Sequence, residues 1–143
     1  DDMIVEQEGI TINEIFDKCG EEYFRKTECE VIKKAAEMKN VVIATGGGVV
    51  LNEQNIENLR KTGVIFNLSP DFSVIQERLE EARKTRPLLK QDSIENIKKR
   101  FDDRKPFYDN CDYKIKVIHG RTPRSYAMEI LEIIESSQGA EKQ

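Results

Sequence analysis

An apolar run that ends in three glycines constrains the fold of this chain more than any other feature. Residues 41–45 (Val-Val-Ile-Ala-Thr) are too short for a helix, and Gly46, Gly47 and Gly48 follow them directly. A continuous apolar run of this length is typical of a strand covered on both faces. Residues 64–68 (Val-Ile-Phe-Asn-Leu) form a second such run. Because helical patterns separate the runs, the sequence predicts a three-layer αβα fold with a parallel sheet.

The helical segments are marked by their first and last residues. Thr11 and Glu14 have the spacing of a capping box, so a short helix should begin there and end at Gly20. A longer helix over 21–38 should turn one apolar face inward, formed by Phe24, Val31, Ala35 and Met38. We expect further helices over 52–61, from Ser69-Pro70 to about 82, from 92 to just before Pro106, and over 122–134, with an edge strand over 112–118.

Two stretches carry no periodic pattern. Residues 83–92 are basic and contain Pro87, so we expect a surface loop there. Residues 136–143 have nothing to bury and should be disordered. The remaining residues, 1–135, are of a length that one domain accommodates.

Composition excludes several classes of protein. The net charge is -4, whereas a general nucleic-acid binder needs a basic face for phosphate contacts. The three cysteines lack the C-x-x-C spacing of zinc sites and are odd in number, which argues against a disulfide framework. No apolar stretch reaches the roughly 18–20 residues of a membrane span, and we expect a cytoplasmic protein with reduced thiols.

Three groups of residues suited to binding anions follow the expected strands or close a helix. They are Gly46-Gly47-Gly48, Arg86-Pro87-Leu88-Leu89, and Arg104-Lys105-Pro106-Phe107-Tyr108. In open α/β sheets, ligands bind outside the carboxyl ends of the strands. Glycines allow the backbone to approach a ligand closely, and guanidinium forks hold carboxylates and phosphates in a fixed orientation. An arginine on a closing loop can stabilise a phosphoryl group in transfer.

Each group also has a simpler interpretation. The glycines could form an ordinary turn, and Arg25 could belong to a solvated ion-pair surface with its neighbouring glutamates. Arg86 could lie in a basic loop without further role. Arg104 could favour a helix C-terminus, where cations interact well with the helix dipole.

The ordered set of motifs resembles shikimate kinase over nearly the whole chain, to about Ile134. The matching residues are Asp1, Ile4, Gly9-Ile10-Thr11-Ile12, Ile15-Phe16, Gly20-Glu21, Phe24-Arg25, Glu28, Thr45-Gly46-Gly47-Gly48, Arg86-Pro87-Leu88-Leu89 and Arg104-x-Pro106-x-Tyr108. This resemblance implies a P-loop fold of the nucleoside-monophosphate-kinase type. It also implies transfer of the ATP γ-phosphoryl to the 3-hydroxyl of shikimate, a step of chorismate and aromatic amino-acid biosynthesis.

The resemblance implies one kinase domain over 1–135, with acceptor-binding helices over 11–39 and a lid over about 83–92. It also implies roles for individual residues. Asp1 matches the acidic residue that holds the shikimate hydroxyls and orients the attacking one. Arg25 and Arg104 match the two arginines that bind the substrate carboxylate, and Glu28 matches a residue that holds Arg25. The remaining matches are Gly46, Gly47 and Gly48 for the turn beside the ring, Arg86 for the lid arginine at the transferring phosphate, and Arg121 for a residue that packs on the adenine.

The resemblance departs from the family at the front of the chain. The phosphate loop G-x-x-x-x-G-K-[ST] occurs nowhere in the sequence. We expect the first strand and this loop to lie upstream of Asp1, so that the chain alone is inactive. ATP with Mg²⁺ is implied, but no metal ligand is assigned. The alternatives are a non-catalytic shikimate-binding paralogue or fragment, or a related P-loop kinase such as gluconate kinase. The partner is a small molecule, and the chain would be a monomer or part of a swapped or split assembly.

Overall fold

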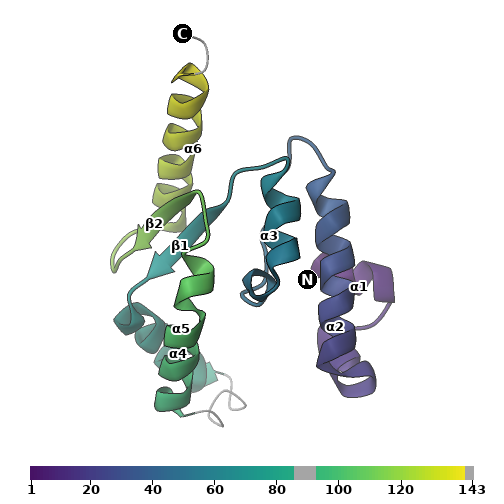
Figure 1. The fold of residues 1–143 in the computed structure, drawn as a ribbon. Coiled ribbons are helices and arrows are strands. Elements are labelled where there is room, and N and C mark those ends of the chain that lie inside the picture. The colour runs from purple at the N-terminus through teal and green to yellow at the C-terminus, as the bar shows by residue number, and fades with distance from the viewer. Residues whose placement is uncertain (86–92, 141–143) are drawn as a thin grey trace. The chain divides into compact units, whose positions relative to one another are not determined.

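The described part of the chain forms two compact units. The computed structural model describes residues 1–85 and 93–140 (Figure 1). One unit spans Asp1–Ile65 and the other spans Phe66–Gln143. The expected lid loop lies mostly outside the described residues, since 86–92 are among those left out.

The first unit is built around one long helix. Helix α2 (Ile12–Ala36) is flanked by α1 (Asp2–Glu8) and α3 (Glu53–Arg60), and a short 3-10 turn, η1 (Val49–Leu51), precedes α3 (Figure 1). The core contains Ile4, Ile15, Phe24 and Val31. Helix α1 has no counterpart in the sequence analysis. It ends at Gly9, whose φ of 70° is a left-handed conformation suited to glycine.

The expected break in α2 is confirmed. Thr11 Oγ1 accepts from the Glu14 amide, and the Glu14 carboxylate accepts from the Thr11 amide at 2.9 Å, which completes the capping box. Gly20 has φ 82° and ψ 173°, so the helical backbone is interrupted there and resumes at Glu21. The segments of α2 before and after Gly20 therefore correspond to the two predicted helices.

Polar contacts fix α1 against α2 as well. The Tyr23 hydroxyl donates to a Glu8 carboxylate oxygen at 2.8 Å, and Lys34 Nζ donates to Gln7 at 2.6 Å. The hydrogen bond to the Glu8 carboxylate raises the pKa of Tyr23. These contacts position the helix whose N-terminal residue is Asp1.

The prediction of a buried strand over 41–45 is wrong for this structure. These residues form no strand, and Val42 is 98% exposed. The reason is that a strand needs a hydrogen-bonded neighbour, and the sheet found in residues 1–85 and 93–140 pairs only β1 and β2. Met38, expected on the inward face, is 51% exposed because α2 ends at Ala36.

The second unit contains a parallel pair of strands with three helices. Strands β1 (Phe66–Pro70) and β2 (Tyr113–Val117) pair in parallel, with Phe66 opposite Tyr113 and Pro70 opposite Val117. The helices are α4 (Phe72–Thr85), α5 (Ile94–Tyr108) and α6 (Pro123–Ala140). Val74, Ile115, Val117 and Tyr126 form the core. The parallel pairing and the helices α4 and α5 between the strands confirm the predicted α/β character.

Both prolines expected at helix boundaries lie elsewhere. Pro70 ends β1 and α4 begins at Phe72, because β1 pairs on one side only and a missing N–H at its end breaks no interior ladder bond. Pro106 lies inside α5, which continues to Tyr108. The proline removes the bond to the carbonyl of Asp102, an exposed residue, so water can satisfy that group.

The last helix is longer than expected. Helix α6 continues to Ala140, whereas we expected disorder from residue 136. The hydroxyl of Ser136 donates to the Glu132 carbonyl at 2.7 Å, and Ser137 donates to the Ile133 carbonyl at 3.0 Å. These bonds to the preceding turn are compatible with helix, so the polar composition does not end it.

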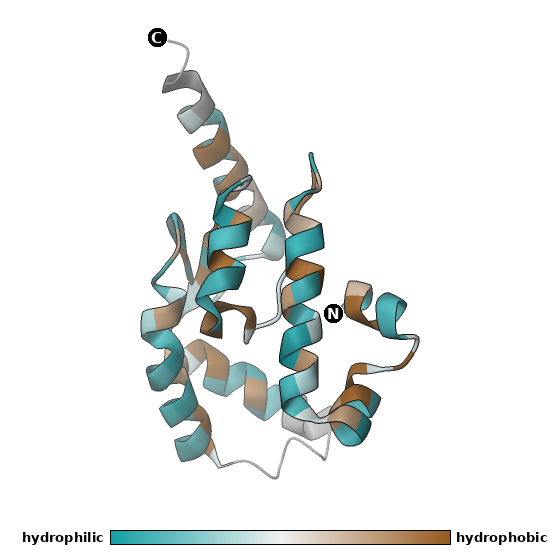
Figure 2. Ribbon diagram, turned by 45° about the vertical axis from the view of Figure 1, so that its right-hand side comes forward, coloured by the Kyte–Doolittle hydropathy of each residue, from teal (hydrophilic) through white to brown (hydrophobic). Residues whose placement is uncertain are grey.

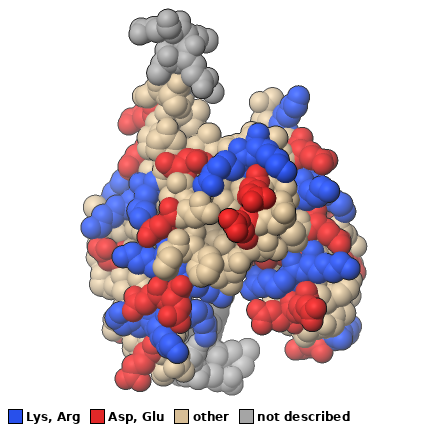
Figure 3. Space-filling model, in the orientation of Figure 1, with Lys and Arg blue, Asp and Glu red and all other residues tan. Residues whose placement is uncertain are grey.

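Hydrophobic and hydrophilic residues alternate along α6, which leads to the end marked C (Figure 2). Lys and Arg lie among Asp and Glu over the face shown in Figure 3. Within residues 1–85 and 93–140, none of the helices has both the length and the apolar composition needed to cross a bilayer.

Candidate functional site

The first unit brings five of the predicted site residues together. Asp1 lies at the N-terminus of α1, Arg25 and Glu28 lie on α2, and Gly46 and Gly48 belong to the turn before η1. A methyl group placed on Gly46 would lie 3.6 Å from Asp1 Oδ1 and 3.9 Å from Glu28 Oε2. Two carboxylates and an arginine therefore border a glycine turn, although 45 positions separate Asp1 from Gly46 in sequence.

A buried carboxylate, that of Glu28, holds the Arg25 guanidinium. Its Nη1 donates to Glu28 Oε1 at 2.8 Å, and its Nε lies 3.6 Å from Glu21 Oε1. The Glu28 side chain is 5% exposed and the Arg25 side chain 31% exposed. The guanidinium also lies 5.2 Å from the centre of the Phe24 ring. One edge of the guanidinium is thus fixed inward, and no residue in the described part of the chain pairs with Nη2.

Gly48 is required here because of space rather than backbone conformation. Its φ of -88° and ψ of -10° are open to any residue. A methyl group on Gly48 would lie 2.6 Å from Arg25 Nη2 and 2.7 Å from Cζ, and it would collide with Nη1 as well. The absence of a side chain lets the Arg25 guanidinium lie directly against the turn.

Asp1 has a defined backbone but a free carboxylate. Its carbonyl accepts from the amides of Ile4 at 2.9 Å and Val5 at 3.0 Å, which begins α1. The side chain makes no capping hydrogen bond. An exposed carboxylate next to the Gly46 turn can accept hydrogen bonds from the hydroxyls of a ligand.

Arg104 belongs to the second unit and lines a cavity there. The cavity has a volume of about 490 Å³ and lies among β1, α4 and α5. Arg100 and Lys105 add positive charge to its lining, and Leu68, Phe72, Ile75, Ile97 and Phe101 give it an apolar wall. Phe72 and Phe101 are in contact, with ring centres 5.6 Å apart. An apolar cavity with guanidinium groups in its lining suits a ring that carries a negative charge.

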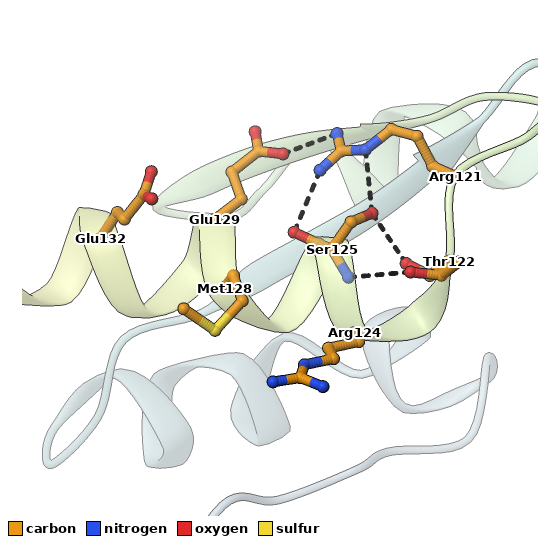
Figure 4. Close-up of a pocket in the computed structure, with 7 residues that line it drawn as sticks. All are labelled: Arg121, Thr122, Arg124, Ser125, Met128, Glu129 and Glu132. Atoms are coloured by element: carbon orange, nitrogen blue, oxygen red, sulfur yellow. Dashed lines mark hydrogen bonds and ion pairs between the residues drawn. The ribbon is translucent and has the colours of Figure 1, made fainter.

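The Arg121 guanidinium is fixed in one plane against α6, which begins two residues later (Figure 4). Its Nη1 lies 2.7 Å from Glu129 Oε2, Nε donates to Ser125 Oγ at 3.2 Å, and Nη2 donates to the Ser125 carbonyl at 3.1 Å. One face lies over the Tyr126 ring at 4.3 Å. Because all three nitrogens are engaged, Arg121 is better suited to stack on a ring than to form hydrogen bonds with a phosphate.

The Tyr126 ring beneath the Arg121 guanidinium is also fixed. The Tyr126 hydroxyl donates to the Ile118 carbonyl and accepts from the Ile118 amide, both at 3.0 Å. Tyr126 is 7% exposed. It therefore joins the end of β2 to α6 and supports Arg121. A surface depression of about 610 Å³ beside Arg121 is bordered by Glu129 and Glu132, and Arg124 points away from the network in Figure 4.

Arg86, the predicted lid arginine, lies outside the described residues. Gly47 lies in the same turn as Gly46 and Gly48. Within residues 1–85 and 93–140, no three His, Cys, Asp or Glu side chains are grouped so that they could hold a metal ion. The described side chains therefore provide no basis for assigning a Mg²⁺ ligand.

Sequence reasoning missed two supporting groups. Asn55 lies beneath the glycine turn at 1% exposure, and Glu129 holds Arg121. Asn55 precedes Ile56 by one residue and Leu59 by four, so an amide on the inward side of an amphipathic helix was the available signal. Nothing in the local sequence distinguishes Glu129 from the other glutamates of its helix.

Comparison with known proteins gives consistent matches. The family model described as shikimate kinase matches residues 1–135. A shikimate kinase of Caldicellulosiruptor bescii is 42% identical over 134 residues, which cover 93% of this chain and 77% of that protein. A shikimate kinase of Aquifex aeolicus is 38% identical over 137 residues, which cover 96% of this chain and 79% of that protein.

Solved structures agree with the sequence matches. Shikimate kinase from Acinetobacter baumannii in complex with shikimate superposes with a TM-score of 0.81 at 32% identity, covering 96% of this chain and 76% of that one. The crystal structure of shikimate kinase from Aquifex aeolicus gives a TM-score of 0.79 at 33% identity, covering 96% and 78% respectively. The described elements therefore follow the same path as most of a shikimate kinase chain.

Proposed function

The chain belongs to the shikimate kinase family, and from this membership we propose that it serves the transfer of the ATP γ-phosphoryl to the 3-hydroxyl of shikimate. The family match runs across both compact units, which supports their belonging to one kinase domain over residues 1–135. Cytoplasmic location and a place in chorismate biosynthesis belong to the same proposal.

The single observation that carries the proposal is the meeting of Asp1, Arg25 and the Gly46–Gly48 turn in the first unit. These groups come from three separate segments of the chain and supply what a polyhydroxylated ring acid needs. Arg25 binds the carboxylate through its free edge, with Glu28 holding the guanidinium in place. Asp1 accepts from the ring hydroxyls and orients the one that attacks. The turn allows the ring to approach the backbone.

The second unit contributes the remaining groups. Arg104 is assigned to the substrate carboxylate by the sequence match, and the cavity that it lines within the second unit supports a role in binding a ring acid. Arg121 is assigned to the adenine, because its plane is fixed and its nitrogens are engaged. Arg86 is assigned to the transferring phosphoryl group, where a guanidinium stabilises developing charge. This last assignment depends on the sequence match alone.

Chemically, the chain's own residues position and stabilise rather than react covalently. Phosphoryl transfer needs an aligned hydroxyl, neutralised phosphate charge and exclusion of water. Asp1 supplies the alignment, and it can hold the proton that leaves the attacking hydroxyl. ATP with its Mg²⁺ supplies the phosphoryl group and part of the charge neutralisation, and no step is assigned to a metal ligand of this chain.

The test is a calorimetric titration of shikimate into the protein, with gluconate as the comparison acid. We expect saturable binding of shikimate and weaker binding of gluconate. Arg25→Ala should weaken shikimate binding by about 1.5–3 kcal/mol, the range for a hydrogen bond to a charged group. Lys33→Ala is the matched control, because it removes the same charge from an exposed position of the same helix.

Circular dichroism and thermal melting accompany the titration, since Arg25→Ala leaves the buried Glu28 carboxylate unpaired. Shikimate phosphorylation is measured by a coupled assay of ADP release, on residues 1–143 and on the protein as its gene encodes it. A folded Arg25→Ala variant with unchanged shikimate affinity would contradict the carboxylate role. Tighter binding of gluconate than of shikimate would contradict the proposed acceptor.

A further inference from the structure

A buried amide lies directly beneath the glycine turn and joins it to α3. Asn55 is 1% exposed, and its Nδ2 donates to the Val49 carbonyl at 3.2 Å. That carbonyl also accepts from the Asn52 amide at 3.4 Å. The Asn55 Oδ1 atom is buried without a hydrogen-bond partner in the described structure. A buried acceptor left without a donor costs free energy of folding. An apolar residue at this position would avoid that cost.

The turn that Asn55 holds is the one that borders the Arg25 guanidinium. The Val49 amide donates to the Gly46 carbonyl at 3.3 Å, and the Leu51 amide donates to the Gly48 carbonyl at 3.1 Å. These backbone bonds join the turn to η1, and residues 41–45 before it form no strand. The Asn55 amide is thus the side-chain hydrogen bond that fixes the carbonyl next to Gly48.

Helix α3 in turn is tied to α2 close to Glu28. Asn52, its capping residue, accepts from the Gln54 amide at 3.0 Å, and its Nδ2 lies 3.8 Å from Cys29 Sγ. The Thr62 hydroxyl donates to the Ala36 carbonyl at 2.5 Å, which joins the chain after α3 to the end of α2. A connected set of contacts therefore runs from α2 through α3 and Asn55 to the turn, and returns to Arg25 across Gly48.

From this geometry we propose that Asn55 is a positioning residue for the acceptor site: it holds the Gly46–Gly48 turn at the distance from Arg25 that binding of the substrate carboxylate requires. The proposal rests on the proposed function for its substrate. Asn55 itself touches neither substrate nor nucleotide. Its amide is retained despite the unpaired acceptor because it fixes the Val49 carbonyl, which a leucine cannot do.

The first experiment compares Asn55→Leu with Asn58→Leu by melting temperature and by shikimate titration. Leucine has a similar volume and removes the unpaired acceptor, so we expect the melting temperature to stay the same or rise. We expect shikimate affinity to fall by about five- to tenfold, the equivalent of one hydrogen bond. Asn58 lies on the same helix and accepts from Lys61 at 3.4 Å, away from the Val49 carbonyl, so Asn58→Leu should leave the affinity unchanged.

A second pair of variants controls for altered packing. Asn55→Thr keeps a hydroxyl donor, and Asn55→Val has nearly the same shape without one. We expect the threonine variant to bind shikimate more tightly than the valine variant, at similar melting temperatures. Equal affinities within this pair, or wild-type affinity in a folded Asn55→Leu protein, would overturn the proposal.

A readout without ligand separates this proposal from the proposed function. Amide hydrogen exchange at Leu51 and Asn52 reports the backbone bonds of the turn. We expect faster exchange in Asn55→Leu than in Asn58→Leu. If the wild-type protein does not bind shikimate but exchange accelerates as expected, the proposed substrate fails while Asn55 still anchors the turn. If exchange is unchanged, the anchoring role itself is refuted.

Discussion

At the scale of single residues, the environment of Arg25 is the most informative part of the molecule. A surface arginine with glutamates three and four positions away has the ordinary pattern of a solvated ion-pair face. The structure separates the two glutamates, because Glu28 is buried and Glu21 is largely exposed. The buried partner fixes one edge of the guanidinium, and the bare backbone of Gly48 lies against it. These contacts fix the guanidinium in one position, as the proposed carboxylate-binding role requires.

Gly48→Ala tests this arrangement directly. The added methyl group would displace the Arg25 guanidinium, while the backbone conformation of residue 48 suits alanine. Because the displaced guanidinium weakens its pair with the buried Glu28, we expect a moderate loss of unfolding free energy, about 1–2 kcal/mol. Shikimate affinity should fall by about tenfold, as for a lost hydrogen bond to a charged group. Calorimetry and urea denaturation measure the two quantities.

Gly46→Ala is the control for Gly48→Ala. Its methyl group would meet Asp1 and Glu28 at 3.6 Å and 3.9 Å, which are ordinary contact distances. It should leave Arg25 in place and reduce affinity less than Gly48→Ala does. The reverse order of the two variants would show that displacement of Arg25 is not what controls binding.

Glu129 gives a prediction for the nucleotide side. Glu129→Gln weakens the contact to Arg121 Nη1. The Arg121 guanidinium, which is assigned to the adenine, is then held less firmly in its plane. Because the pair is partly exposed, we expect the KM for ATP to rise only about two- to fivefold, with the KM for shikimate unchanged. Glu132→Gln removes a charge beside the same depression without touching this network. Equal effects of the two variants in the coupled kinase assay would argue against a positioning role for Glu129.

At the scale of elements, local signals predicted most helices of the chain. The capping box placed the start of α2, and Gly20 marked its interruption. The helix expected over 52–61 is α3, with Asn52 as its capping residue. Strand β2 was predicted within one residue of each end. The errors came where the surrounding structure, rather than the local sequence, decides where an element begins or ends. Prolines 70 and 106 have the local character of boundaries, but a one-sided strand and an exposed carbonyl tolerate them.

The capping box carries a pH dependence. The Thr11 amide and hydroxyl donate to the Glu14 carboxylate, which lowers the pKa of Glu14 below its ordinary value of 4.5. A lowered pKa in the folded state means that the stabilisation is complete above pH 4.5 and is lost as the pH falls through the folded-state pKa. Glu14→Gln should therefore be less stable than the wild type at neutral pH, with the difference shrinking on acidification.

Urea denaturation over a series of pH values measures this effect, with Glu22→Gln as the control. Glu22 is an exposed carboxylate on the same helix and lies outside the capping box. Its substitution should leave the pH profile near that of the wild type. A constant difference between Glu14→Gln and the wild type at all pH values would exclude a contribution from the ionised carboxylate.

At the scale of the whole molecule, the predicted fold class and family are confirmed. The parallel pairing of β1 and β2 and the TM-scores near 0.8 agree with the αβα fold expected from the alternation of strands and helices. The run 41–45 shows the limit of that reasoning. Its composition predicted burial, yet burial requires other segments to cover it, and Val42 is exposed in the described structure. Composition indicates whether a segment favours burial, but packing against other segments decides whether it is buried.

The sequence by itself determined the starts of α2, α3 and α6, the glycine turn and the family, because these depend on neighbours along the chain and on ordered motifs. The tertiary structure alone decided which edge of Arg25 is free, how closely Gly48 borders it and that Asn55 lies beneath the turn. Thirty positions separate Arg25 from Asn55, and both lie close to the same turn through the contact of α2 with α3. No local pattern encodes such a contact, since its geometry arises only when separate segments share one core.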